Sequence, residues 1–327
     1  MKKLMPFLAI FAAVLIAAAG DPAGTRPLTD LGKGKYKGEE GGLYGAGKNE
    51  PPEAHLKLAM AEAAQIRPLD AEGKAADDGK IVFLSLGMSN TSMDFTAFTK
   101  AAGNDKELSP RVLLVNGAQG GMDAAKWADP KATSRNSDRG VWEEALERIK
   151  VAGASPAQVQ AAWMKQAHAG PAKNGEFPKH ARALSDDLET IAKEARKRFP
   201  NLRLLYLSSR TYAGYAKTQL NPEPYSYEGA FAVRWLIEKQ AGGDAGLNAD
   251  AKKGEVKAPV LLWGPYLWAD GANKRADGFA WAPEDFTEKD GTHPSESGQK
   301  KVADLLLKFL KTDGTAKGWF VKSPATK

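Results

Sequence analysis

The chain has 327 residues, no cysteine and a formal net charge of +6, and 43% of its residues are hydrophobic. This composition suits one sizeable globular domain with a well-buried core, and it excludes a disulfide framework, a thiol nucleophile and cysteine-ligated zinc. Basic residues are scattered among acidic ones rather than clustered, so the charge does not indicate nucleic-acid binding.

The first twenty residues have the layout of a secretory signal peptide. Lys2 and Lys3 precede an apolar run over residues 4–16, and small residues follow at 17–20. We expect cleavage near residue 20 and a secreted or periplasmic protein. The alternative is an uncleaved anchor, but the apolar run is short for a membrane span. We therefore expect no stable membrane insertion after cleavage.

Residues 21–78 are polar and rich in glycine, lysine and alanine. This composition predicts an irregular segment packed on the main domain, which we expect to span residues 79–327. One helix is predicted near residues 52–65, because Pro51 and Pro52 precede a run of good helix formers.

Beyond residue 79, apolar runs alternate with helical patterns. Strands are predicted at residues 81–86, 111–116, 159–164, 202–207 and 259–263, and helices near residues 93–101, 141–152, 180–199 and 231–240. Strands that are apolar on both faces and alternate with helices indicate a mostly parallel sheet covered on both sides. The predicted fold class is therefore α/β, a three-layer α/β/α sandwich with five central strands. The tail after Asp313 is expected to fray, apart from Trp319 and Phe320.

Two short segments, far apart in the chain, contain residues that could act together. Gly87-Met88-Ser89-Asn90 follows the first predicted strand, where small residues allow a tight turn that exposes a serine. Asp290-Gly291-Thr292-His293 comes just before the last predicted helix. A serine hydroxyl becomes a good nucleophile when a base removes its proton, and a carboxylate that orients that base helps further. The two segments together supply all three roles.

Each segment alone also has an ordinary structural explanation. Ser89 could be a turn or capping serine, and Thr91 and Ser92 are rival hydroxyls, of which Ser92 fits better as a helix N-cap.

The remaining histidines are expected to be solvated or capping: His55, His168 and His180. No further histidine or acidic residue at metal-ligand spacing accompanies the Asp290/His293 pair, so we expect neither a metal nor another cofactor.

The order and flanks of the two segments resemble those of the SGNH (GDSL-like) hydrolases, over roughly residues 79–311. Gly87-Met88-Ser89-Asn90 looks most like the Gly-Gln-Ser-Asn variant of the sialate and xylan acetylesterases, with Met88 in place of glutamine. The resemblance implies a flavodoxin-like fold. It also implies a catalytic triad of Ser89, His293 and Asp290.

The same resemblance implies an oxyanion hole of two or three donors. The backbone N–H of Ser89 is one donor, and the glycine-rich turn that contains Gly120 and Gly121 is expected to supply another. The family's third donor is a side-chain amide after the third strand, but its Gly-x-Asn motif is absent here. Alignment to the Trp-x-Gln pattern puts Lys165 at that place, whereas Gln166 matches the chemistry better. The sequence leaves both residues open.

The expected substrate is an acylated carbohydrate or another small ester. Aromatic residues are frequent at the ends of the later strands. Core packing explains at least half of them, and the others could stack on sugar rings. The candidate substrate-binding residues are Asn90, Arg210, Tyr212 and Trp268. Two alternatives to an esterase remain at this stage. One is a non-catalytic glycan-binding module of the same fold, and the other is an envelope-associated structural protein whose glycine-rich segment docks a partner.

Overall fold

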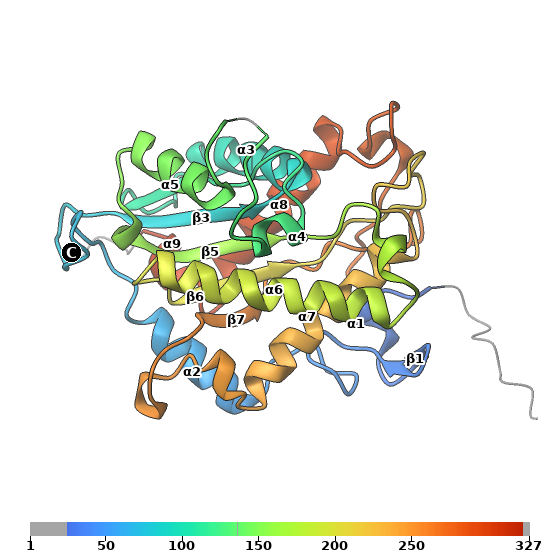
Figure 1. The fold of residues 1–327 in the computed structure, drawn as a ribbon, viewed down its shortest axis with the longest axis horizontal. Helices are drawn as coiled ribbons and strands as arrows, with labels where there is room; N and C mark the ends of the chain where they lie inside the picture. The colour runs from blue at the N-terminus through green and yellow to red at the C-terminus, as the bar shows by residue number, and fades with distance from the viewer. Residues whose placement is uncertain (1–24, 136, 323–327) are drawn as a thin grey trace, which may run out of the picture.

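The computed structural model describes residues 25–135 and 137–322. The expected export signal, residues 1–20, lies outside the described residues. The described chain forms a five-stranded sheet with helices on both faces (Figure 1). The α/β/α sandwich expected from the sequence is therefore confirmed.

All neighbouring strands of the central sheet are parallel. The strands are β3 (Ile81–Gly87), β4 (Val112–Asn116), β5 (Val159–Lys165), β6 (Leu204–Ser208) and β7 (Val260–Trp263). Their order is β4-β3-β5-β6-β7, a doubly wound arrangement whose direction of winding reverses at β3. Ligands of such sheets bind outside the carboxyl ends of the strands at this reversal. The residues that directly follow β3 therefore occupy the preferred place for a site.

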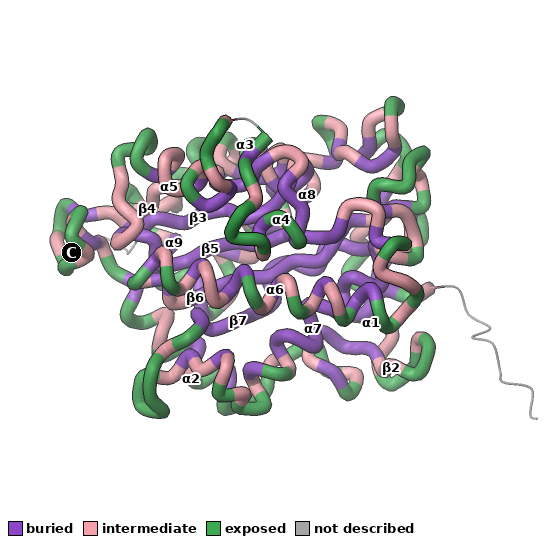
Figure 2. The backbone as a smooth tube through the Cα atoms, in the orientation of Figure 1, coloured by how far each residue is buried: buried purple, intermediate pink, exposed green. Residues whose placement is uncertain are grey.

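Helices cover both faces of the sheet, so every residue of β3 and β5 is buried (Figure 2). The helices α3 (Ser89–Gly103) and α8 (Glu296–Thr312) pack on one face, where Phe83 and Trp163 point. The opposite face, where Val82 points, is covered by α5 (Val141–Val151), α6 (Lys179–Arg198) and α7 (Tyr225–Ala241). Successive residues of a strand thus contribute to different core clusters, as the two-residue period of a strand requires.

Shorter elements complete the described chain. They are α1 (Leu28–Leu31), β1 (Lys35–Tyr36), β2 (Glu39–Glu40), α2 (Glu53–Ala63), α4 (Ala124–Ala128), α9 (Lys317–Phe320) and the 3-10 helices η1 (Pro156–Gln158), η2 (Pro171–Asn174), η3 (Ala245–Leu247), η4 (Ala251–Lys253) and η5 (Pro283–Asp285). The helix predicted near residues 52–65 corresponds to α2.

The N-terminal segment packs on the rest of the fold through both apolar and polar contacts. Leu28 is fully buried, and its backbone N–H donates to the Tyr266 hydroxyl at 3.0 Å. The indole N–H of Trp263 donates to the Leu43 carbonyl oxygen at 2.6 Å. These contacts join the segment to β7 and to the loop that follows it.

Two sequence predictions about element ends were wrong. Helix α3 begins at Ser89, so Ser92 lies inside its first turn rather than at an N-cap. Residues 314–322 do not fray: α9 forms there, and Trp319 and Phe320, the two residues excepted from the expected fraying, are buried and join the core cluster under α8. The last five residues, 323–327, lie outside the described residues. A pair of apolar rings gives a short terminal segment enough buried area to stay ordered.

Candidate active site

Ser89, His293 and Asp290 form a continuous chain of hydrogen bonds at the carboxyl end of the sheet. Ser89 Oγ lies 2.8 Å from His293 Nε2, and His293 Nδ1 lies 2.6 Å from Asp290 Oδ2. The side chains of His293 and Asp290 are 27% and 18% exposed, so the chain of bonds is reachable from solvent. The structure thus brings together two segments that are some two hundred residues apart.

The hydrogen-bond partners of Asp290 define which nitrogen of His293 carries a proton. Burial alone would raise the pKa of Asp290. Hydrogen bonds from the backbone N–H groups of His293 and Thr292, and from the His293 and Thr287 side chains, outweigh burial and hold the pKa well below its usual range. An ionised carboxylate only accepts, so His293 Nδ1 carries the proton. The unprotonated Nε2 then accepts from Ser89 Oγ, which is the arrangement a general base needs.

The loop that carries Asp290 and His293 is held by tight packing around Gly291. Gly291 has a φ of +60°, and a Cβ atom there would lie 1.9 Å from the Tyr215 carbonyl oxygen. Only glycine permits both this conformation and this approach. The backbone N–H of Lys217 also donates to the Asp290 carbonyl oxygen at 2.8 Å. The segment after β6 therefore supports the loop from one side.

A second tie joins the histidine loop to the start of α3. Asn90 Nδ2 donates to the Thr292 carbonyl oxygen at 2.9 Å, and the Asn90 side chain is 2% exposed. Asn90 was expected to bind substrate, but its amide is buried in this contact with Thr292, the residue before His293. Sequence reasoning also missed Thr287, whose hydroxyl donates to Asp290 Oδ1 at 2.8 Å. Its spacing of three residues before Asp290 was the available signal.

The glycine-rich turn after β4 lies beside the nucleophile turn, as expected. The backbone N–H of Gln119 donates to the Gly87 carbonyl oxygen at 2.9 Å. A Cβ atom added at Gly120 would meet nothing within 4 Å, so Gly120 borders open space. At Gly121 the Arg135 side chain would lie 2.3 Å from such an atom, so Arg135 extends along this turn.

The two candidates for the third oxyanion donor have different surroundings. Lys165 is 0% exposed, and its ammonium group forms an ion pair with the equally buried Asp94. Its charge is therefore buried in the core against Asp94. Gln166 is 2% exposed, and its Nε2 makes only a long contact of 3.5 Å with the Met122 carbonyl oxygen. Met122 directly follows Gly121, so Gln166 lies against the glycine-rich turn.

The expected substrate-binding residues are mostly buried. Trp268 is 1% exposed and its indole N–H donates to Glu223 Oε1 at 2.8 Å, so its ring packs in the core and offers no face to a sugar. Arg210 is 2% exposed, and burial lowers the pKa of its guanidinium to about 10. Tyr212 remains partly exposed and stacks edge-to-face on Tyr215, with ring centroids 5.0 Å apart.

The other three histidines are buried, so the expectation that they are solvated was wrong. His55 Nε2 donates to the Leu261 carbonyl oxygen at 2.7 Å, His168 Nε2 lies 2.7 Å from Asp187 Oδ2, and His180 Nε2 lies 2.6 Å from Glu228 Oε2. Because a carbonyl oxygen only accepts, the ring of His55 is the donor in its bond. Each histidine joins elements that are far apart in the sequence, which is a structural role.

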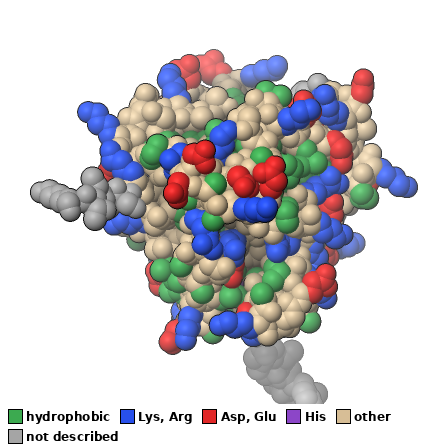
Figure 3. All heavy atoms as spheres, turned by 90° about the vertical axis from the view of Figure 1, so that its left-hand side faces the viewer, with side chains coloured by type: hydrophobic (Ala, Val, Ile, Leu, Met, Phe, Trp, Pro, Cys, Tyr) green, Lys and Arg blue, Asp and Glu red, His purple; other side chains and the backbone are tan. Residues whose placement is uncertain are grey.

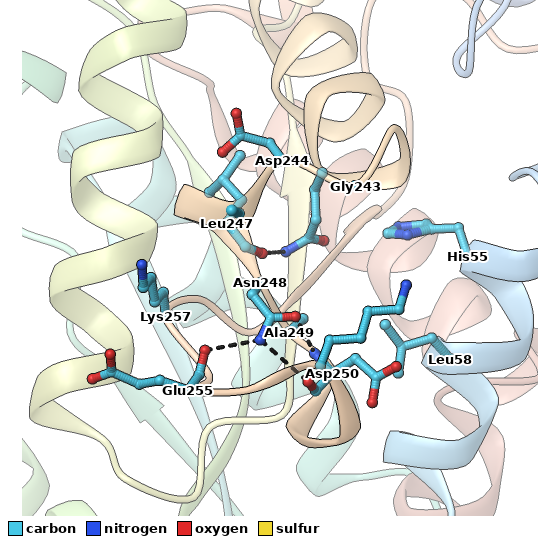
Figure 4. A pocket seen from close by; sticks show the side chains of 13 residues that line it. His55, Leu58, Gly243, Asp244, Leu247, Asn248, Ala249, Asp250, Glu255 and Lys257 are labelled. Carbon is cyan, nitrogen blue, oxygen red and sulfur yellow. Dashed lines mark hydrogen bonds between the residues drawn. The ribbon is translucent and has the colours of Figure 1, made fainter.

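The amino end of the sheet offers a cavity but no comparable chemistry. Figure 3 shows this end of the molecule, where lysine and arginine side chains are interspersed with acidic ones. A cavity of about 430 Å³ lies here between α2 and the loop before β7, and His55 lines it (Figure 4). Its polar side chains stabilise turns: Asn248 Nδ2 donates to the Glu255 carbonyl oxygen at 2.8 Å, and Asp250 Oδ1 accepts from the backbone of Lys252. No serine or threonine lines this cavity.

No helix within residues 25–135 and 137–322 is long and apolar enough to cross a membrane. In the same part of the chain, no three histidine, aspartate or glutamate side chains lie close enough together to hold a metal ion.

Comparisons with known proteins were also made. No family model and no curated protein matches the chain. A Bacteroides fragilis protein whose assignment as an acylhydrolase is provisional shares 14% identity, with a TM-score of 0.39 over 79% of this chain and 96% of that one. A salicylyl-acyltransferase from a tetracycline biosynthetic pathway shares 11%, with a TM-score of 0.36 over 75% and 58%. An extracellular lipase from Streptomyces rimosus shares 11%, with a TM-score of 0.31 over 70% and 99%. Likeness of this degree carries no functional argument.

Proposed function

We propose that the protein is a serine esterase of the SGNH type that removes small acyl groups, acetyl foremost, from carbohydrate. The observation that carries the proposal is the hydrogen-bonded chain from Ser89 through His293 to Asp290. It lies at the winding reversal of a doubly wound sheet, and its histidine is partly open to solvent. The base is then in hydrogen-bond reach of both the nucleophile and the orienting carboxylate.

In the proposed reaction, Ser89 Oγ attacks the ester carbonyl carbon while His293 Nε2 takes the hydroxyl proton. The carbonyl π electrons move to the oxygen, and the resulting oxyanion is stabilised by backbone N–H groups of Ser89 and of the turn at Gly120 and Gly121. Collapse of this intermediate expels the alcohol, which receives the proton from His293, and leaves the acyl group on Ser89. Water then attacks the acyl-enzyme and gives a proton to His293. Collapse of this second intermediate releases the acid, and His293 returns the proton to Ser89 Oγ.

Gln166 is the better third donor of the two candidates. Its amide lies against the glycine-rich turn and is held by one long hydrogen bond, so a bound oxyanion could recruit it at small cost. A carbohydrate acceptor is supported by Tyr212 and Tyr215, two partly exposed rings next to the histidine loop. Aromatic rings in such a place can stack on a sugar.

Hydrolysis of nitrophenyl acetate by the parent protein and by Ser89→Ala tests the proposal. We expect the substitution to abolish turnover without changing the fold, because it removes the attacking oxygen and almost no packing. Ser92→Ala is the matched control, and it should retain turnover because Ser92 lies one turn further along α3. Glycan binding without turnover by the parent protein would instead favour the non-catalytic module.

We also propose export, on the basis of residues 1–20. A bacterium expressing the full chain should contain the protein outside its cytoplasm, with a new N-terminus near Gly20 or Asp21. Mass spectrometry of the exported protein measures this terminus. An exported chain that still carries Met1 would indicate an uncleaved anchor.

A further inference from the structure

A buried ion pair lies directly behind the turn that carries the nucleophile. Lys165 ends β5, Asp94 lies in the second turn of α3, and the Lys165 ammonium group binds Asp94 Oδ2. Both side chains are 0% exposed. A buried ion pair is weak evidence for stability, because removing the two charges from water costs about as much free energy as their attraction returns. Stability alone therefore does not explain the pair, which connects the end of β5 to α3.

Lys165 holds α3 at a second point through its backbone. The Thr91 hydroxyl donates to the Lys165 carbonyl oxygen at 2.6 Å. Lys165 pairs with Gly87 across the sheet, and a Cβ atom on Gly87 would lie 2.6 Å from the Lys165 carbonyl oxygen and 2.3 Å from Thr91 Oγ1. No side chain larger than that of glycine therefore fits at residue 87, where the ends of β3 and β5 meet the first turn of α3. Ser89 lies in that turn.

A third charge completes the cluster. Arg210 is 2% exposed, its charge acts on Asp94, and its Nε and Nη1 atoms make no hydrogen bond within the described residues. Burial raises the pKa of Asp94 and lowers the pKa of Lys165, whereas their mutual attraction opposes both shifts. Asp94 shares a helix face with Phe95 and Phe98, so the two cations explain how an acid can remain there.

We propose that Lys165 is a positioning residue that clamps the start of α3 with its ammonium and carbonyl groups and so keeps Ser89 Oγ in reach of His293. This inference rests on the proposed function of Ser89. The competing role, direct stabilisation of the oxyanion by the ammonium group, requires that group in the cleft. In the structure it faces Asp94 in the core.

A double-mutant cycle on full-length protein separates the two roles. The variants are Lys165→Met, Asp94→Leu and the two combined, assayed with nitrophenyl acetate and scaled to the folded fraction from near-UV circular dichroism. Each single variant leaves one buried charge unpaired, and we expect kcat to fall by about 10²-fold with KM within about two-fold, because displaced reacting groups lose rate rather than binding. The double variant replaces the pair with apolar side chains, so we expect kcat to recover to within about ten-fold of the parent.

Each outcome of this cycle decides the matter. A folded double variant that stays about 10²-fold slow would show that the ammonium charge itself is needed at the oxyanion, and would overturn the inference. Unchanged kcat per folded molecule in Lys165→Met would show a purely structural role, and would overturn it too. If the single variants do not fold, the kcat of the double variant decides alone: recovery to within about ten-fold of the parent supports the inference, and a loss of about 10²-fold overturns it. The pH dependence of kcat in the double variant should have the same shape as in the parent. Absence of Ser89-dependent turnover in the parent would refute the proposed function instead.

Thr91→Val tests the second half of the clamp. Valine keeps the shape of threonine but loses the hydrogen bond to the Lys165 carbonyl oxygen, so we expect kcat to fall about five-fold with KM unchanged. Thr99→Val is the matched control on the same helix, because the Thr99 hydroxyl bonds only to the Phe95 carbonyl oxygen of α3 itself. Thr99→Val should keep the parent kcat, and equal losses in the two variants would contradict the clamp.

Discussion

In two histidine–carboxylate pairs of this molecule the nitrogen–oxygen distance is the same, but the surroundings differ. His293 Nδ1 and Asp290 Oδ2 are 2.6 Å apart, as are His180 Nε2 and Glu228 Oε2. The side chains of the first pair are 27% and 18% exposed, whereas those of the second are 3% and 1% exposed. Only His293 has a serine hydroxyl on its other nitrogen. The separation between imidazole and carboxylate therefore does not distinguish the two pairs, whereas solvent access and the serine hydroxyl do.

The surroundings of Glu228 show what the second pair does. Glu228 Oε1 accepts from the Tyr36 hydroxyl at 2.6 Å and lies 2.8 Å from Lys37 Nζ, so one carboxylate joins the N-terminal segment, α6 and α7. The His180 ring packs edge-to-face on Tyr225, with ring centroids 4.8 Å apart. This pair connects elements and leaves no room for a substrate.

The largest expected difference in kcat is between the variants in which His293 or His180 is replaced with glutamine. His293→Gln should lower kcat by about 10⁶-fold, because loss of a triad base removes the activation of the nucleophile. His180→Gln should leave kcat per folded molecule unchanged. Turnover of an acetyl ester by both variants measures the contrast, and a comparable loss in His180→Gln would end the distinction drawn between the two pairs.

Asp290→Asn should have the next largest effect. The amide keeps the shape of the carboxylate but can present a donor to His293 Nδ1, which favours the wrong tautomer, and comparable changes cost about 10⁴-fold in kcat. The expected KM is close to that of the parent. A loss below about ten-fold would mean that Asp290 does not orient the imidazole.

Gln166→Ala should cost less than either triad substitution. Loss of one oxyanion donor acts on the transition state, so we expect kcat to fall by about 10²- to 10³-fold with little change in KM. Gln119→Ala is a suitable control, because the Gln119 amide is buried and donates to the Val141 carbonyl oxygen at 2.7 Å. If both variants keep kcat near the parent's, neither amide serves the oxyanion.

Glu228→Gln should have the smallest effect on kcat but a clear effect on the free energy of unfolding. Hydrogen bonds from His180, Lys37 and Tyr36 outweigh burial and lower the pKa of Glu228. A lowered folded-state pKa stabilises the fold above the unfolded value of about 4.3, and this contribution is lost as the pH falls below it. Urea unfolding of parent and variant should therefore differ at pH 7 and converge near pH 3. A constant difference would contradict the ionised state of Glu228.

The sequence predicts the Asp290/His293 pair and the sheet because both depend on local patterns. Asp290 and His293 are three residues apart, and each strand is a short run that is apolar on both faces. Ion pairs between residues far apart in the chain could not be predicted from the sequence. Lys165 and Asp94 are 71 positions apart, and His180 and Glu228 are 48 positions apart. Asp94 did carry a signal, since an acid on the apolar face of a helix needs a partner. Nothing local identified Lys165 as that partner.

Burial of aromatic residues was also beyond local reasoning. Trp268 is of a residue type that stacks on sugars, but it is buried, and its ring packs against Tyr227 of α7 with centroids 4.7 Å apart. Tyr212 belongs to the same group of aromatic residues in the sequence and remains partly exposed. Only the packing of distant elements separates the two.

The most direct test of the central claim is to identify the residue that becomes acylated. The protein is mixed with nitrophenyl acetate, quenched in acid within the first turnover, digested and analysed by mass spectrometry. We expect an acetyl group on Ser89 in the parent and none on that peptide in Ser89→Ala, because the mechanism passes through an ester of this hydroxyl. An acetyl group on Thr91 or Ser92, with Ser89 free, would contradict the assignment of the nucleophile.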